Sequence, residues 1–104
     1  LLVEPIGYLE SIYLVDHAKQ VITDSGGLQR EAFFAGVKCT TLLDFEVWPE
    51  TMVGNRNLLA RPDAQSILSA ISSHQTIDSS YAPFGSGGAA SKIVEAVTRY
   101  LKGE

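Results

Sequence analysis

The sequence lacks the features that mark several specialised classes of protein. Among its 104 residues there is a single cysteine, Cys39, which excludes an internal disulfide and a cysteine-rich metal site. We therefore expect a reducing compartment, the cytoplasm. No apolar run approaches the ~20 residues that cross a bilayer, so we expect no membrane partner.

Positive charge is also scarce. Eight Lys and Arg residues stand against twelve Asp and Glu residues, a net charge of −4, so the chain has no basic footprint for nucleic acid. Hydrophobic residues make up 45% of the chain, enough for a globular core, which argues against disorder. A length of about 100 residues predicts one small domain, residues 1–104.

The beginning of the chain has no initiator Met and no signal peptide. The apolar residues 1–3 run into a loop at Pro5, which is typical of the end of a strand. We expect the chain to be a fragment of a longer protein.

Apolar runs and helical patterns alternate along the whole sequence, with turn residues between them. We predict strands at residues 20–24, 37–43 and 57–60, helices at 8–15, 28–35, 50–53, 64–71 and 90–101, and a loop at 73–88. Such alternation predicts parallel strands with right-handed crossovers and helices on both faces of the sheet. The fold class is therefore α/β, a doubly wound parallel sheet or half of one.

The join after the first predicted strand is the richest candidate site. Gly26 and Gly27 have no side chains, so the backbone is accessible at the start of the next helix. The free N–H groups and the dipole of that helix favour a phosphate, and the Ser25 hydroxyl can donate to the same anion. Glu31, one turn beyond Gly27, can accept hydrogen bonds from ribose hydroxyls. The alternative is a tight turn with Ser25 as N-cap and Glu31 as a solvated charge, and the spacing alone favours neither.

Two hydrolase interpretations fit poorly. The tetrapeptide Asp24-Ser25-Gly26-Gly27 matches the nucleophile segment of trypsin-like proteases, but those enzymes are β-barrels and this pattern is α/β. The nucleophile elbow of α/β-hydrolases requires a glycine where Thr23 stands.

The remaining chemically distinctive residues are isolated. His17 and His74 lie near predicted helix ends without a partner at metal-ligand spacing, so we expect no metal site and no catalytic histidine here. Cys39 is expected to be a buried apolar residue within a strand. Trp48 follows a strand, where ligands bind, although packing is the commoner role of such a residue.

Three separated motifs resemble the C-terminal part of the UDP-N-acetylglucosamine 2-epimerase family. They are TDSGGLQREA at residues 23–32, WPET at 48–51 and PFGSGGAASKI at 83–93. The resemblance implies a Rossmann-like domain, the C-terminal portion of a two-domain glycosyltransferase-B-type fold. It assigns Ser25 and Gly27 to the diphosphate, Glu31 to the ribose, and the loop at residues 44–50 to the border of the nucleotide. The expected UDP-binding residues are Ser25, Gly26, Gly27, Glu31 and Trp48.

The resemblance also implies an activity, which is inversion at carbon 2 of a UDP-sugar by elimination and re-addition of UDP. The acid–base groups for this reaction come from the part of the family's protein that precedes this chain, so we expect no catalytic residue here and an inactive fragment. The implied partners are the UDP-sugar and an N-terminal domain of the same protein, and a homodimer is compatible with the family. No metal or redox cofactor is implied.

The chain departs from the family at two positions. Many members have arginine where Leu43 and Trp48 stand, which leaves the identity of the UDP-sugar open. Two alternatives remain: a nucleotide-sugar glycosyltransferase domain of the same architecture, and a free-standing α/β binding domain.

Overall fold

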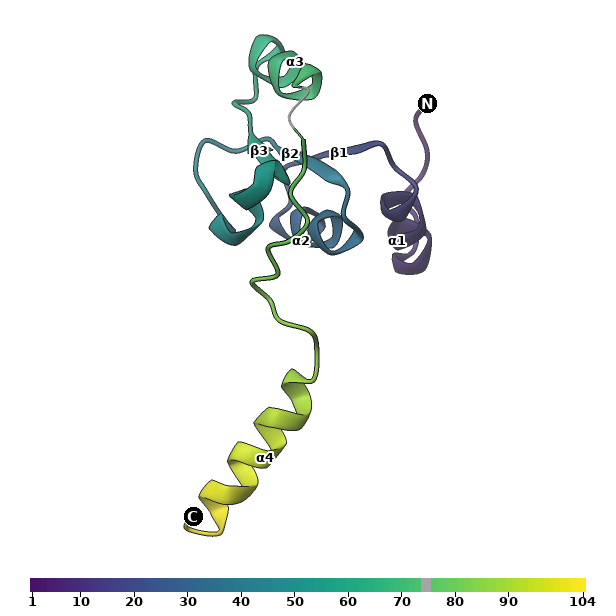
Figure 1. The fold of residues 1–104 in the computed structure, drawn as a ribbon. Helices are drawn as coiled ribbons and strands as arrows, with labels where there is room; N and C mark the ends of the chain where they lie inside the picture. The colour runs from purple at the N-terminus through teal and green to yellow at the C-terminus, as the bar shows by residue number, and fades with distance from the viewer. Residues whose placement is uncertain (74–75) are drawn as a thin grey trace.

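The computed structural model describes residues 1–73 and 76–104, and it has an α/β fold around a three-stranded parallel sheet (Figure 1). His74, one of the two histidines considered above, lies outside the described residues. The elements are α1 (Tyr8–Asp16), β1 (Gln20–Thr23), α2 (Gly26–Ala35), β2 (Lys38–Thr41), the 3-10 segment η1 (Pro49–Asn55), β3 (Asn57–Leu59), α3 (Ala64–Ser72) and α4 (Ala89–Leu101). The strands lie in the order β1-β2-β3, so the predicted parallel α/β architecture is confirmed.

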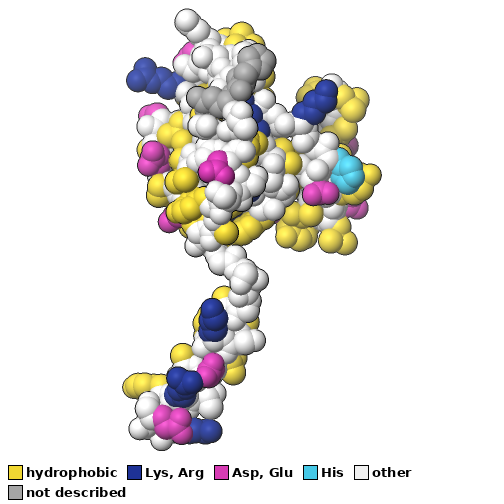
Figure 2. Space-filling view, in the orientation of Figure 1, with side chains coloured by type: hydrophobic (Ala, Val, Ile, Leu, Met, Phe, Trp, Pro, Cys, Tyr) yellow, Lys and Arg dark blue, Asp and Glu magenta, His cyan; other side chains and the backbone are white. Residues whose placement is uncertain are grey.

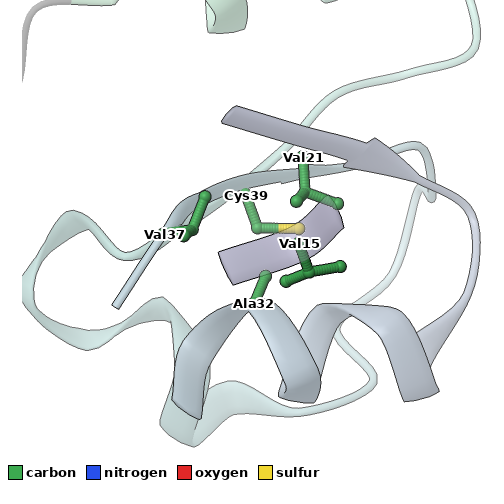
Figure 3. Packing of buried hydrophobic residues seen from close by; sticks show 5 residues of the cluster. All are labelled: Val15, Val21, Ala32, Val37 and Cys39. Carbon is green, nitrogen blue, oxygen red and sulfur yellow. The ribbon is translucent and has the colours of Figure 1, made fainter. Parts of the chain in front are cut away.

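The first face of the sheet carries the core. Alternate residues of a strand point to opposite faces, and Val21 of β1 and Cys39 of β2, which are register partners, both point toward α2 (Figure 3). They pack with Val15 of α1, Ala32 of α2 and Val37. The three valines are nearly fully buried and together contribute about 5 kcal/mol of hydrophobic stabilisation.

Cys39 has the buried position that the sequence predicts. Its side chain is 1% exposed, and this burial raises the pKa of the thiol to about 11, although a hydrogen bond with Thr41 opposes the rise. The thiol is therefore neutral at physiological pH and serves as a small apolar group.

The second face of the sheet is covered only in part, by α3. The Lys38 ammonium on this face donates to the carbonyl oxygens of Ala70 and Ser73, at the C-terminal end of α3. A cation at this end of a helix also complements the helix dipole. Ile22 on the same face remains 45% exposed.

The C-terminal end of α2 is closed by a glycine and an arginine. Gly36 has φ 71°, the left-handed conformation that favours glycine, and it ends the helix as the sequence predicts. Arg56 is buried, and its guanidinium carbon lies 3.7 Å from the centroid of the Phe33 ring. Its guanidinium group also donates to the Phe33 carbonyl oxygen. This arginine therefore caps α2 and holds β3 against it.

The terminal helix α4 extends away from the rest of the molecule (Figure 1), and none of its residues is buried. The radius of gyration of the Cα atoms is 17.1 Å, whereas a compact domain of this length has about 13 Å. The predicted apolar stripe of this helix exists but is exposed, as Figure 2 shows by the hydrophobic side chains on the projecting helix.

Two sequence-based predictions need correction. Residues 1–3 form no strand, because no described strand lies beside them to accept and donate the backbone hydrogen bonds that a strand requires. The apolar stripe predicted at residues 64–71 forms a helix, but Leu68 is 62% exposed and only Ala70 of α3 is buried. The helical pattern was correct, and the second face of this short sheet is too small to cover the stripe.

Candidate functional site

The carboxyl ends of the three parallel strands meet at one edge of the sheet, where ligands of α/β proteins bind. β1 leads through Asp24 and Ser25 into α2, β2 leads through residues 42–48 into η1, and β3 leads through residues 60–63 into α3. Of the predicted site residues, Ser25 and Trp48 belong to the first two of these connections, and Gly26 and Gly27 begin α2.

The turn from β1 into α2 is fixed by two hydroxyl groups. The Ser25 N–H donates to Thr23 Oγ1 at 3.0 Å, and Ser25 Oγ accepts from the Leu28 N–H at 3.3 Å, so Ser25 is the N-cap of α2. The N–H groups of Gly26 and Gly27 come before the first intrahelical hydrogen bond, which the Gln29 N–H makes to the Ser25 carbonyl. Among the described residues, these two backbone donors have no partner, and they lie at the positive end of the helix dipole.

The two glycines of the turn serve different purposes. A Cβ atom at Gly26 would lie 3.0 Å from Val47 Cγ1 and 3.2 Å from Trp48 Nε1, so this glycine lets the connection after β2 close against the turn. A Cβ atom at Gly27 would meet only Ser25 Oγ, at 3.5 Å, and Gly27 does not have a positive φ. Neither packing nor backbone conformation requires Gly27 to be glycine, and its open side leaves space for a ligand against the backbone.

Buried polar contacts hold the connection after β2 in place. Gln29 of α2 is 1% exposed and donates through Nε2 to Thr51 Oγ1 at 2.6 Å, and the Thr51 hydroxyl donates to the Trp48 carbonyl at 2.7 Å. This chain of hydrogen bonds fixes Trp48 beside Gly26. Sequence reasoning missed Gln29, although an amide beside the apolar positions of a helix is a signal for such a contact.

Trp48 is thus both a packing residue and a wall of the site. Its indole lies against Gly26. The indole also contacts Arg30, whose guanidinium carbon is 4.3 Å from the centroid of the Trp48 ring. Arg30 is a second residue of this edge that sequence reasoning missed.

Glu31 lies apart from this turn, in a groove between α1 and α2. The groove has a volume of about 520 Å³, and Glu31 shares it with Tyr8, Ile12, Tyr13 and Asp16. As a residue Glu31 is half-buried, and it lies one helical turn beyond Gly27, as the spacing predicts. The structure therefore joins Trp48 to the glycine turn and places Glu31 in a neighbouring groove.

The described residues also bear on metal and membrane binding. His17 is the C-cap of α1, its Nδ1 lies 2.8 Å from the Tyr13 carbonyl oxygen that it bonds, and its ring stacks on Tyr13. Nowhere in residues 1–73 and 76–104 do three His, Cys, Asp or Glu residues gather as they would around a metal ion. In the same part of the chain, every helix is too short or too polar to cross a membrane.

The chain is similar to known proteins of one family. The family described as UDP-N-acetylglucosamine 2-epimerase matches residues 1–98. In Methanococcus maripaludis, a UDP-N-acetylglucosamine 2-epimerase homolog is 42% identical over 97 residues, which are 92% of this chain and 27% of the relative. The UDP-2,3-diacetamido-2,3-dideoxy-D-glucuronate 2-epimerase of Pseudomonas aeruginosa is 36% identical over 93% of this chain and 28% of its own length.

A solved structure is also similar. The UDP-GlcNAc 2-epimerase of Methanocaldococcus jannaschii, in complex with UDP-GlcNAc and UDP, has a TM-score of 0.78 and 34% identity, over 92% of this chain and 27% of that one. The chain therefore spans about a quarter of the length of the proteins it matches. It belongs to the UDP-N-acetylglucosamine 2-epimerase family.

Proposed function

We propose that the carboxyl edge of this sheet binds the UDP moiety of a UDP-sugar through Ser25, Gly26, Gly27, Glu31 and Trp48. The observation that carries the proposal is the pair of free backbone donors at Gly26 and Gly27, which are open to solvent on the Gly27 side. A diphosphate fits such a helix N-terminus because it is anionic and accepts several hydrogen bonds. The relative solved with UDP-GlcNAc and UDP supports this ligand class.

The groove beside Glu31 suits the nucleoside. A carboxylate accepts the two hydrogen bonds that vicinal ribose hydroxyls donate, and the neighbouring Tyr8 and Tyr13 offer aromatic surface for a base. Glu31 and the glycine turn lie on the same helix, one turn apart, so one nucleotide can extend from the turn to the groove.

In the full-length protein we propose the reaction of the family, interconversion of UDP-GlcNAc and UDP-ManNAc in the cytoplasm. UDP leaves from C1 and a proton leaves from C2, which gives a glycal. UDP then adds back to C1 and a proton adds to the opposite face of C2, which gives the other configuration at C2. The residues described here hold the nucleotide, and the groups that move the C2 proton belong to the rest of the protein. The 104 residues alone are therefore inactive and bind UDP weakly.

The fold that we propose for the full-length protein has two Rossmann-like domains, in the glycosyltransferase-B arrangement, with the ligand between them. The exposed stripe of α4 supports this proposal, because Ile93, Val94 and Val97 are all more than half exposed and lie on one side of a helix. We propose that the N-terminal domain covers this stripe. A second copy of the protein is the alternative partner.

The proposal is tested by incubating the full-length protein with UDP-GlcNAc in D2O and following the C2 position by NMR. We expect deuterium at C2 and the appearance of UDP-ManNAc. Release of UDP that depends on an acceptor, without exchange at C2, would instead support a glycosyltransferase. Binding of UDP without either reaction would support a binding domain.

A further inference from the structure

Arg30 is a cation close in sequence to the glycine turn. It lies in the second turn of α2, beyond the first turn in which the helix dipole acts most strongly on charged side chains. Within residues 1–73 and 76–104 the ion pairs are His17–Asp16 and Arg99–Glu95, so no described carboxylate compensates the charge of Arg30. The partner of Arg30 among the described residues is instead the Trp48 ring.

The direction of the Arg30 side chain is set by α2 and by Trp48. Side chains of a helix lean toward its N-terminus, and Arg30 lies four residues after Gly26 on the same face. Its guanidinium carbon is 4.3 Å from the centroid of the Trp48 ring, and the Nε1 atom of that ring is 3.2 Å from where a Cβ of Gly26 would lie. The same indole thus borders both the guanidinium group and the glycine turn.

Stacking on Trp48 also restricts a flexible side chain. An exposed arginine has many rotamers, and a cation over the face of an indole is held by the quadrupole of the ring. Trp48 is itself fixed by the hydrogen bonds from Gln29 through Thr51. The guanidinium group is therefore held over the Trp48 ring before any ligand arrives, and no hydrogen bond among residues 1–73 and 76–104 occupies its N–H donors.

We propose that Arg30 binds the diphosphate held at the Gly26–Gly27 turn, and that Trp48 is the residue that positions it. The inference rests on the proposed function and adds to it the source of the positive charge. A guanidinium group is suited to this role because its planar N–H donors match two phosphate oxygens.

The test compares the dissociation constants of UDP and uridine for the full-length protein and its variants by calorimetry. Arg30→Gln should weaken UDP binding about tenfold, the loss of one charge-assisted contact, and leave uridine binding unchanged. Trp48→Ala should also weaken UDP binding, because it releases Arg30 and removes the indole beside the turn. The double variant should lose less affinity than the two separate losses combined, because Trp48 acts in part through Arg30. Arg99→Gln, which removes an exposed arginine of α4, is the matched control and should bind UDP like the wild type.

The possible outcomes separate this inference from the proposed function. If the wild type binds UDP and Arg30→Gln binds it equally well, the inference is overturned and the proposed function stands. If Arg30→Gln weakens uridine and UDP equally, Arg30 has only a structural role and the inference is again overturned. If the wild type binds neither UDP nor uridine, both proposals fail.

Discussion

At the scale of single residues, the two glycines of the turn have separate roles. Gly26 is required by its neighbours, because Val47 and Trp48 occupy the space where a side chain would be, whereas only the hydroxyl of Ser25 lies near the open side of Gly27. A residue that neither packing nor conformation requires to be glycine is a strong indication of ligand approach, because the fold would accept alanine there.

This difference can be tested with two matched variants. Gly27→Ala should keep the free energy of unfolding or raise it by about 0.5 kcal/mol, because alanine is the better helix former. The same variant should weaken UDP binding about tenfold or more, because the methyl group fills the space of the ligand. Gly26→Ala should lower the free energy of unfolding by about 1 kcal/mol, because Val47 and Trp48 must move. The measurements are thermal unfolding and UDP titration. A Gly27→Ala variant that binds UDP like the wild type would contradict the assignment.

The position of Trp48 shows the limit of sequence reasoning at this scale. Ser25, Gly26 and Gly27 are neighbours in the sequence, so their local geometry follows from the strand, turn and helix signals around them. The contact between Trp48 and Gly26 depends on the path of the loop after β2 and on the buried hydrogen bonds of Gln29 and Thr51. No local pattern encodes that path, and Arg30 was missed because its importance depends on Trp48.

At the scale of elements, the sequence predicted the strands and helices where local signals agreed with packing. β1 and β2 are β-branched runs between turn residues, and both form. Asp63 is the N-cap of α3: its carboxylate accepts from the Ser66 N–H at 2.8 Å, and this contact lowers the pKa of Asp63. The prediction of a strand at residues 1–3 was wrong because strand pairing needs two segments, and the sequence of one segment does not reveal whether its partner is present.

The attachment of α3 to the sheet depends on one side chain. Lys38→Met keeps the aliphatic stem and removes the ammonium that donates to Ala70 and Ser73, so we expect the free energy of unfolding to fall by about 1.5 kcal/mol. Amide hydrogen exchange should show the loss in α3 before it appears in β1. Lys92→Met on the exposed α4 is the control and should leave both measurements unchanged. Equal exchange rates in α3 of the wild type and of Lys38→Met would refute the assignment.

At the scale of the whole molecule, the chain is a compact α/β body with one projecting helix (Figure 1). An isolated helix of 13 residues is only marginally stable in water, so we expect α4 to gain stability from a partner. The sequence predicted both the helix and its apolar face, because each is a local pattern. A local pattern does not encode what packs against that face. The matched relatives are about four times as long as this chain.

The proposed cover of α4 can be tested by placing the same charge on two sides of the helix. Val97→Asp introduces a carboxylate into the apolar stripe, and Thr98→Asp introduces one outside it. In the 104-residue chain both variants should unfold like the wild type, because α4 has no buried residue. In the full-length protein Val97→Asp should lower the free energy of unfolding by about 3 kcal/mol, because the charge is forced into an apolar contact, and Thr98→Asp should lower it by less than about 0.5 kcal/mol.

If the two variants are equally stable in the full-length protein, the stripe faces solvent there and the proposed contact with the N-terminal domain is wrong. If Val97→Asp is destabilised only at concentrations at which the protein self-associates, the stripe is covered by a second copy instead.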